Sequence, residues 1–320
     1  MIDVLLPASG KPFVDLIFTG LPKLPDPGEE VYARDLTIVP GGAMTAALVL
    51  HRLGLRVVFE ATLGRDFGSR FLLNIMEEEG LPRDGVVIRD EVRANITVAY
   101  NIQGDRSFLS YLGGDIPPDP ALVERFPSRC VLLAGLRPGE RLTAALRNAR
   151  ANRSLIVADT QEQPLTLQDE PLRELIASLD VLLCNEREAR FVSGQEDIDR
   201  AVEVLATLTP TLVVKRGARG ASAYWAYGPT HLEALPCEAV DLTGCGDNFT
   251  AAFTAALVDG QSLPTCLAWG NAAGAITAQH PGGTSARISR EQIISSAERH
   301  YGDKLLPDPL RNVTMEEDRK

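Results

Sequence analysis

The sequence contains no run of eighteen apolar residues, so it lacks the hydrophobic segment that a membrane-spanning helix requires. Its N-terminus also lacks the basic segment followed by an apolar one that marks a secretory signal peptide. Basic residues are in deficit, with 32 Lys and Arg against 43 Asp and Glu, which gives a net charge of −11. We therefore expect neither nucleic acid nor an anionic membrane as a partner.

Cysteine and histidine are both scarce. The chain has 5 Cys and 4 His, and neither set shows the spacing of a metal site. The five cysteines are odd in number and dispersed, which is typical of reduced thiols and predicts a cytoplasmic protein: Cys130, Cys184, Cys237, Cys245 and Cys266.

Two nucleotide-binding patterns are missing as well. We find no Gly-x-x-x-x-Gly-Lys-Ser/Thr, which excludes a P-loop kinase. A dinucleotide dehydrogenase would need Gly-x-Gly-x-x-Gly early in the chain. Here Gly244-x-Gly246 comes late and is followed by Phe249 where the third glycine would stand.

What the chain has is an alternation of short apolar runs with amphipathic stretches. The runs read as buried strands: Cys130–Ala134, Leu155–Ala158, Val181–Cys184 and Leu212–Lys215, with Val57–Leu63 earlier. The stretches read as helices: Ala43–Leu53, Glu140–Ala151, Pro171–Leu179 and Asp197–Leu208. This alternation predicts an α/β protein with a mostly parallel central sheet and helices on both faces.

A second group of predicted strands breaks this rhythm. Ala94–Asn101 and Arg106–Leu112 have the pattern of a hairpin, and Phe13–Thr19 and Glu30–Ile38 could join them in a small separate sheet. The segment 307–320 is charged and contains proline, so we expect a mobile tail after a domain spanning residues 1–306.

The most specific motif runs from Asp241 to Asp247, Asp-Leu-Thr-Gly-Cys-Gly-Asp, and leads into an apolar helical pattern. A glycine turn at a helix start can bring backbone N–H groups close to an anion. A carboxylate at such a site repels the anion, so its presence indicates a function, such as accepting a proton from an attacking hydroxyl. The plainer alternative is that Asp247 only caps the helix.

This motif resembles the C-terminal signature of the ribokinase, or phosphofructokinase-B, family of sugar kinases. The family pattern is Asp–Thr–x–Gly–Ala–Gly–Asp, whose last Asp is the catalytic base; Leu242 and Cys245 are departures from it. The likeness extends from about Asp3 to about Ser285. It implies a ribokinase-like three-layer α/β/α fold with a small β-sheet lid, formed by parts of residues 12–40 and 92–113, that covers the sugar and often forms the dimer surface.

On the substrate side, the resemblance implies that Asp15 binds the sugar, because it ends the segment Gly-x-x-x-x-Asp near the start of the chain. A carboxylate can accept two hydrogen bonds, which suits a vicinal diol. Gly41 and Gly42 match the family's N-terminal glycine pair, with Thr45 nearby; alone, the pair would read as an ordinary turn. The family's following Asn is replaced by Ala46, which leaves the sugar unidentified.

On the nucleotide side, Asn185 and Glu188 match the family's Asn-x-x-Glu, which positions hydrated Mg²⁺. The same spacing also fits a helix capping box. Lys215, Gly217 and Gly220 match the loop that lines the ATP site. Lys215 could reach a phosphate. The alternative, which the sequence supports equally, is that Lys215 is a solvent-exposed residue at the end of a strand.

Three further assignments follow from the resemblance. Thr243 lies in the nucleotide site, and Asn271 corresponds to an Asn beside the adenine, with close helix packing as the alternative. Asp241, together with residues 281–285, occupies the place where relatives hold a monovalent cation such as K⁺.

The reaction implied is ATP-dependent phosphorylation of a sugar hydroxyl in a homodimer formed through the lid. Asp247 faces the hydroxyl, and the N–H groups of Gly244, Cys245 and Gly246 neutralise the transferring phosphoryl. At a helix N-terminus we expect Asp247 to have no raised pKa. The alternatives are a nucleoside kinase of the same fold and a non-catalytic sugar-binding sensor.

Overall fold

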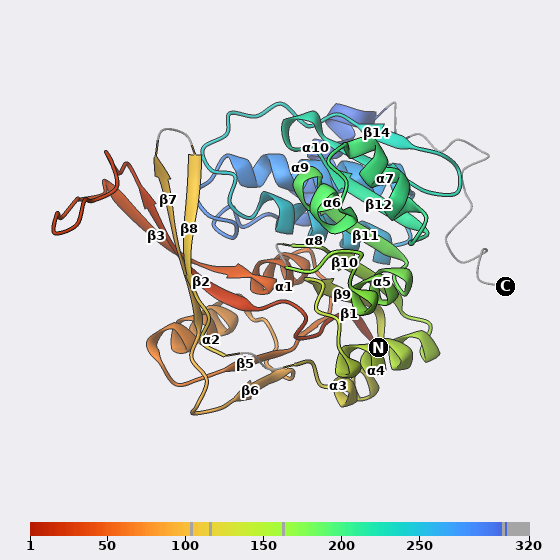
Figure 1. Ribbon diagram of the computed structural model, residues 1–320, viewed down its shortest axis with the longest axis horizontal. Coiled ribbons are helices and arrows are strands. Elements are labelled where there is room, and N and C mark those ends of the chain that lie inside the picture. Colours follow the sequence, from red (N-terminus) through yellow and green to blue (C-terminus); the bar gives the residue numbers. More distant parts are fainter. Residues whose placement is uncertain (103–104, 115–116, 162–163, 303–304, 306–320) are drawn as a thin grey trace.

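The computed structural model describes residues 1–102, 105–114, 117–161, 164–302 and 305. The predicted tail, residues 307–320, lies outside them. The described chain is an α/β protein with one large sheet and a small sheet that projects from it, as predicted (Figure 1). Within this part of the chain, no helix is long and apolar enough to cross a membrane.

The large sheet has eight strands in the order β14-β13-β12-β11-β10-β9-β1-β4. Its parallel part consists of β4 (Val57–Phe59), β1 (Ile2–Leu6), β9 (Ser128–Ala134), β10 (Leu155–Asp159), β11 (Val181–Asn185) and β12 (Thr211–Lys215). The antiparallel strands β13 (Ala221–Tyr224) and β14 (Thr230–Leu232) complete one edge. Since ligands bind at the carboxyl ends of parallel strands, this arrangement locates the site at one edge of the sheet.

Helices cover both faces of the large sheet and create two hydrophobic cores. One core contains α1 (Ala43–Arg52), α2 (Phe67–Glu79), α8 (Cys245–Val258), α9 (Leu263–Ala278) and α10 (Arg290–Tyr301). The other contains α3 (Pro120–Arg125), α4 (Glu140–Ala151), α5 (Glu170–Ala177), α6 (Glu186–Ser193) and α7 (Ile198–Ala206). The three-layer prediction is therefore confirmed.

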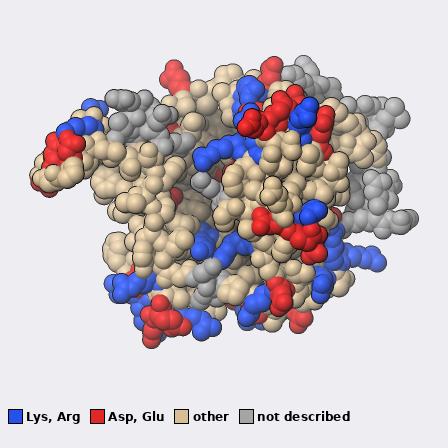
Figure 2. All heavy atoms as spheres, in the orientation of Figure 1, with Lys and Arg blue, Asp and Glu red and all other residues tan. Residues whose placement is uncertain are grey.

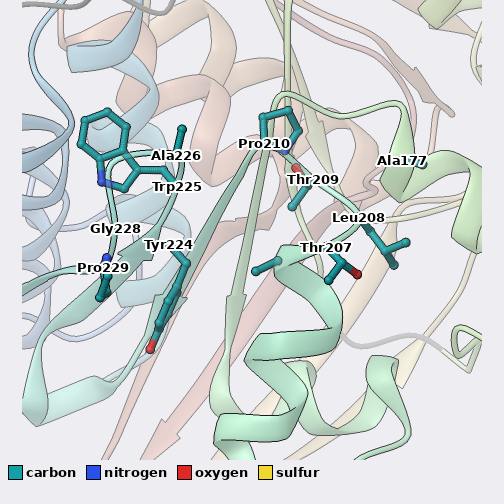
Figure 3. A pocket seen from close by; sticks show the side chains of 11 residues that line it. Ala177, Thr207, Leu208, Thr209, Pro210, Tyr224, Trp225, Ala226, Gly228 and Pro229 are labelled. Carbon is teal, nitrogen blue, oxygen red and sulfur yellow. The ribbon is translucent and has the colours of Figure 1, made fainter.

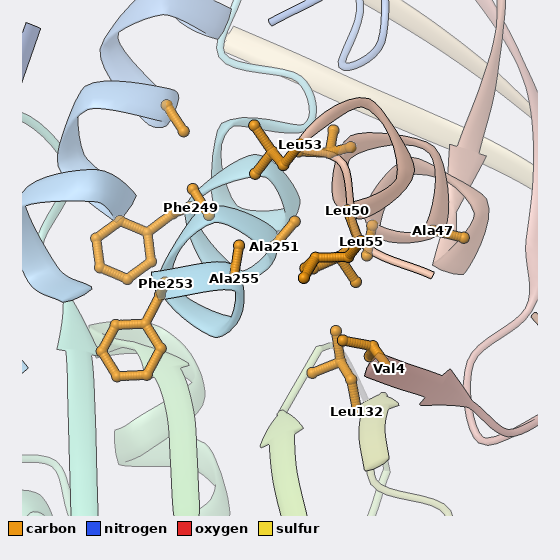
Figure 4. Close-up of a cluster of buried hydrophobic side chains, with 14 of the residues drawn as sticks. Val4, Ala47, Leu50, Leu53, Leu55, Leu132, Phe249, Ala251, Phe253 and Ala255 are labelled. Atoms are coloured by element: carbon orange, nitrogen blue, oxygen red, sulfur yellow. The ribbon is translucent and has the colours of Figure 1, made fainter. Parts of the chain in front are cut away.

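Helix α8 is buried along almost its entire length. Its Phe249 and Phe253 rings stack on each other, and Phe249 packs where a side chain on Gly270 of α9 would have to lie. Ala251 and Ala255 lie on the side of α8 that faces Leu50 of α1 (Figure 4). This packing fixes the direction of α8, and with it the position of the glycine turn at its N-terminus.

The small sheet has the strand order β3-β2-β7-β8. Its strands are β3 (Asp35–Gly42), β2 (Pro12–Thr19), β7 (Asn95–Ile102) and β8 (Asp105–Tyr111). The prediction that a strand begins at Glu30 was wrong, because β3 begins at Asp35 and continues through the glycine pair. Gly41 and Gly42 thus pair with Phe13 and Pro12 of β2 and lead directly into α1.

The predicted strand Val57–Leu63 is in fact two strands, β4 and β5 (Ala61–Leu63), and β5 pairs with β6 (Val86–Ile88) in a separate two-stranded sheet. The break falls at Glu60, whose buried carboxylate accepts hydrogen bonds from the backbone N–H groups of Ala8 (2.8 Å) and Asp119 (2.6 Å). These partners are distant in sequence, so the pattern of apolar residues does not indicate the break.

Candidate active site

The glycine turn before α8 has a conformation that only glycine adopts readily. Gly244 has φ 72°, and a Cβ on it would lie 2.4 Å from the Cα of Gly283. The Asn248 amide donates to the carbonyls of both Gly244 (2.8 Å) and Gly283 (2.7 Å). Two loops that are distant in sequence are thereby held together at the start of a helix, where the first N–H groups have no carbonyl partner in a preceding turn.

Asp247 lies in the first turn of α8 and is half-buried. Burial raises its pKa to about 7; the nearby carboxylates of Asp159 and Asp15 contribute, while Lys215 and a hydrogen bond from Gln161 oppose the rise. The expectation of no raised pKa was therefore wrong. The favourable potential of the helix N-terminus is outweighed by desolvation and by like charges. A carboxyl that titrates near neutral pH suits proton transfer from an alcohol.

Lys215, at the end of β12, is not a solvated strand end. Its ammonium donates to both oxygens of Asp159 (2.7 and 2.8 Å), and the two side chains are only 13% and 5% exposed. The Thr250 hydroxyl also donates to Asp159 (2.6 Å). The Lys215 Nζ lies 3.4 Å from where a Cβ on Gly246 would be. A fixed cation therefore borders the glycine turn.

The Asp15 carboxylate belongs to β2 of the small sheet. Burial raises its pKa to about 7, with a contribution from the charge of Asp241. It packs directly on Gly41, because a Cβ on Gly41 would lie 1.9 Å from the Asp15 Oδ2. Since Asp15 also raises the pKa of Asp247 electrostatically, these two predicted site residues share one region.

Asp241 connects the turn before α8 to the loop 281–285. Its Oδ1 accepts hydrogen bonds from the N–H (2.9 Å) and the hydroxyl (2.8 Å) of Thr243, and its Oδ2 accepts one from the N–H of Gly282 (2.8 Å). Thr243 is therefore oriented by Asp241. The Cys245 N–H donates to the carbonyl of Leu242 (3.3 Å), so it is less available to an anion than predicted.

Asn185 and Glu188 form the capping box at the start of α6. The Asn185 Oδ1 accepts from the N–H of Glu188 (2.9 Å), and Glu188 accepts from the N–H of Asn185 (2.8 Å). The alternative structural reading is thus confirmed. The capping box is compatible with the predicted position beside the nucleotide phosphates. Asn185 and Lys215 are paired at the ends of β11 and β12, and the charge of Glu188 acts on Lys215.

The loop Gly217–Gly220 follows β12 and needs both glycines. Gly217 and Gly220 have φ values of 57° and 86°, and a Cβ on Gly220 would lie 2.0 Å from the carbonyl oxygen of Leu232. Arg216 is not solvated either: it donates to Glu186 (2.6 Å), Ser222 (3.0 Å) and Tyr224 (2.8 Å). A groove of about 620 Å³ borders this loop, lined by Arg216, Ala218, Arg219, Ser222, His231, Glu233 and Ala234.

Asn271 on α9 has its amide nitrogen engaged within the protein. It donates to the carbonyls of Leu232 (3.2 Å) and Glu233 (3.2 Å) and to the hydroxyl of Tyr301 (3.1 Å). These contacts match the packing alternative, and a contact with adenine stays a prediction. On α1, Thr45 is fully buried and its methyl group is close to Gly283, while Ala46 is buried as well.

The space-filling view shows a hollow between the small sheet and the body of the molecule (Figure 2). The carboxyl ends of the parallel strands lie on this side. A second groove, of about 700 Å³, lies elsewhere, between Thr207–Pro210 and Tyr224–Trp225 (Figure 3). It is at the amino end of β12, so it is remote from Lys215 and is not the candidate active site.

Three residues of the site were missed or undervalued in the sequence: Asp159, Gln161 and Thr250. Asp159 ends a parallel strand, which was the available signal, but most such residues only form turns. In the described residues, no group of three or more His, Cys, Asp and Glu side chains could hold a metal ion.

Comparison with protein families gives one match that covers most of the chain. The model of the pfkB family carbohydrate kinases matches residues 12–290. Among characterised relatives, the ribokinase of Bacillus subtilis is 27% identical over 300 residues, which cover 88% of this chain and 96% of the relative. The nucleoside kinase of Methanothermobacter thermautotrophicus is 25% identical over 257 residues, which cover 77% and 80%.

Among solved structures, the ribokinase of Arabidopsis thaliana complexed with ribose and ATP has a TM-score of 0.78. The superposition covers 93% of this chain and 99% of that one at 22% identity. At this level of identity, the likeness concerns the fold.

Proposed function

Because the chain belongs to the pfkB family of carbohydrate kinases, we propose that the cleft between Asp15 and Asp247 transfers the γ-phosphoryl group of ATP to a hydroxyl of a sugar or sugar derivative. One observation carries this proposal. A carboxyl with a pKa of about 7 lies in the first turn of a buried helix, beside a glycine turn that can receive an anion. A proton acceptor and an anion site in contact are what phosphoryl transfer to an alcohol requires.

Each side of the cleft has its own role in this proposal. Asp15 accepts hydrogen bonds from the sugar, and Gly41 leaves room for its carboxylate. Asp247 orients the attacking hydroxyl and takes its proton as the new oxygen–phosphorus bond forms and the bond between the γ-phosphorus and the ADP oxygen breaks, which releases ADP. The N–H groups of Gly244 and Gly246 stabilise charge on the transferring group, with a smaller contribution from that of Cys245, which also donates to Leu242. One such donor is commonly worth ~10²–10³ in turnover. Gly42 and Thr45 complete the sugar side.

The nucleotide would lie along the ends of β11 and β12. Lys215 supplies a positive charge, the loop Gly217–Gly220 borders the groove beside it, and Asn185, Thr243 and Asn271 provide polar contacts. Mg²⁺ would be held through water by Glu188 and Asn185, and it would neutralise phosphate charge when bound. This sparse donor set fits Mg²⁺, which keeps several waters.

A monovalent cation such as K⁺ would lie near Asp241 and the loop 281–285. The amide oxygen of Asn248 supports this, because it is buried close to Gly283 and accepts no hydrogen bond from any residue that the structure describes. An oxygen without a donor is a favourable neighbour for a cation.

We also propose that the small sheet forms a homodimer. On one of its faces, Leu16, Ile38, Val98 and Leu109 lie in a single row across the four strands. Asp15 lies on the opposite face with Val39 and Thr97, so this row points away from the cleft. Ile38 is 40% and Leu109 69% exposed.

An apolar face of this kind is typical of an interface between copies. Leu109→Asp should yield a monomer by light scattering, whereas Phe67→Asp on α2, at a residue that is also 69% exposed, should not. A cytoplasmic location is supported by the five cysteines, since none of them forms a disulfide within the described part of the chain.

The test of the proposed function is an assay of ADP formation. The protein, ATP and Mg²⁺ are combined with pentoses, hexoses, sugar acids, sugar phosphates and nucleosides, with Asp247→Asn as the matched control. We expect ADP release that depends on a sugar and on Mg²⁺. Turnover with nucleosides alone would establish the nucleoside kinase alternative. Sugar binding by thermal shift without any turnover would establish the sensor.

A further inference from the structure

Gln161 is a side chain of the cleft that the assigned roles leave without a function. Its Nε2 donates a hydrogen bond to the Asp247 Oδ1 (3.3 Å). Gln161 lies in the loop just after β10, whereas Asp247 lies in the first turn of α8. Among the described residues, this is the one hydrogen bond to the Asp247 carboxylate.

The backbone of Gln161 has the left-handed conformation, with φ 52°. This conformation is unfavourable for residues other than glycine, and where it persists the surrounding structure must impose it. Thr160 imposes it from one side, because both its N–H and its hydroxyl donate to the carbonyl of Leu183 on β11 (2.9 Å each). The chain is thus fixed at Thr160 and turns sharply into Gln161, whose side chain is directed toward α8.

The side-chain amide of Gln161 also lies near the loop after β9. Its Oε1 is 3.6 Å from the position that a Cβ on Gly135 would take, which is an ordinary van der Waals distance, so the two residues are neighbours. Gly135 has φ 138° and is buried. The amide therefore occupies a space between the loops after β9 and β10, with its nitrogen on the carboxylate of Asp247.

We propose that Gln161 is a positioning residue, whose side-chain amide holds the Asp247 carboxylate in the orientation that receives the substrate hydroxyl. This inference rests on the proposed function of Asp247. An amide N–H that donates to a carboxylate also favours its ionised form, in which the second oxygen remains an acceptor. The other groups that face Asp247 are charged: Asp159 from β10, Asp15 from β2 and Lys215 from β12. Gln161 is the neutral donor among them.

The experiment compares three variants of Gln161 in the full-length protein. Gln161→Met keeps the length of the side chain and removes the donor. Gln161→Glu keeps its shape and replaces the donor with a carboxylate. Gln161→Gly removes the side chain and relieves the backbone conformation. Gln168→Met, an exposed position on the same segment, is the matched control.

Two readouts are needed, because one of them must not depend on catalysis. The first is the dependence of kcat and of kcat/KM on pH for the best sugar. The second is the pKa of Asp247, measured by carboxyl ¹³C chemical shift in protein labelled at aspartate and assigned with Asp247→Asn.

In Gln161→Met, we expect the pKa of Asp247 to rise, the acid limb of kcat/KM to move to higher pH by the same amount, and kcat near pH 7 to fall roughly tenfold. The KM for ATP should change less than twofold. Gln161→Glu should displace the acid limb further, because a second carboxylate repels the first. Gln161→Gly should lose as much kcat as Gln161→Met while its melting temperature does not fall, and Gln168→Met should resemble the unmodified protein.

A pKa of Asp247 that is unchanged in Gln161→Met and Gln161→Glu would overturn the inference. So would a loss of activity that is equal at every pH and tracks a lower melting temperature, since that would indicate a structural role only. An unmodified protein without kinase activity would instead refute the proposed function, and the ¹³C titration would still report whether Gln161 acts on Asp247.

Discussion

The carboxylate of Asp15 occupies the space that a side chain on Gly41 would fill, since a Cβ there would lie 1.9 Å from the Asp15 Oδ2. The two residues lie on adjacent strands, β2 and β3, close to the point where β3 enters α1. The glycine is therefore needed for the position of the acid. This relationship gives the first test of the sugar side of the cleft.

Gly41→Ala should displace the Asp15 carboxylate and raise the KM for the sugar roughly tenfold or more, because a hydrogen bond to a charged group is worth about 1.5–3 kcal/mol. The KM for ATP should be nearly unchanged. Steady-state kinetics with both substrates varied would measure this. Gly139→Ala is the control, since a Cβ on Gly139 meets nothing within 4 Å. An unchanged sugar KM in Gly41→Ala would show that Asp15 does not bind the sugar.

Replacing Asp247 with Asn should lower kcat at least about a hundredfold, because the amide cannot accept the proton of the attacking hydroxyl. The KM values for both substrates should stay within a few-fold of the unmodified protein. Single-turnover measurements would separate the chemical step from product release. If Asp247→Asn retained most of the turnover, Asp247 would be only a helix cap.

The raised pKa of Asp247 also predicts how its replacement affects stability. Between its ordinary value of 3.8 and about 7, the folded protein holds a proton that the unfolded chain has released. The contribution of this group to stability therefore falls as the pH rises through that window, and it stays low above it. Asp247→Asn removes this cost.

The melting temperature of Asp247→Asn should consequently exceed that of the unmodified protein by about 2 °C or more near pH 8. The difference should shrink toward pH 4. Calorimetry at several pH values would measure it. A variant that is less stable near pH 8 would contradict the assignment of the raised pKa to burial.

Lys215 and Asp159 form a buried pair, and breaking it should be costly. Lys215→Met leaves the charge of Asp159 without its main partner, which should reduce the free energy of unfolding by about 3–5 kcal/mol. Adding Asp159→Asn removes that charge and should restore much of the loss. If Lys215 also contacts the nucleotide, the KM for ATP should remain raised in the double variant. Denaturant unfolding and ATP kinetics on both variants would separate the two roles.

The alternation of strands and helices could be predicted from the sequence because burial on both sides leaves a clear local pattern. Helix Glu140–Ala151 has the predicted bounds, and α1 begins at the predicted Ala43. The antiparallel strands that complete the sheet edge leave a weaker pattern, because β13 has only four residues and β14 only three, and the chain turns back between them. That turn depends on tertiary contacts rather than on local periodicity.

In the candidate site too, some features have a local sequence pattern and others depend on tertiary contacts. The glycine turn and Asp247 could be predicted because their backbone requirements are local to one motif. The electrostatic state of Asp247 could not, since it depends on Asp159 and Asp15, which are distant in sequence. Gln161 left no signal in the sequence, because its hydrogen bond to Asp247 depends on a left-handed backbone and on a partner 86 residues away.

The most direct measurement is a crystal structure with a non-hydrolysable ATP analogue and the best sugar substrate. Our account predicts a sugar hydroxyl within hydrogen-bond distance of the Asp247 carboxylate, with other hydroxyls on Asp15 and the terminal phosphate at the N–H groups of residues 244–246. A nucleotide bound away from the glycine turn, or a sugar that does not reach Asp247, would contradict it.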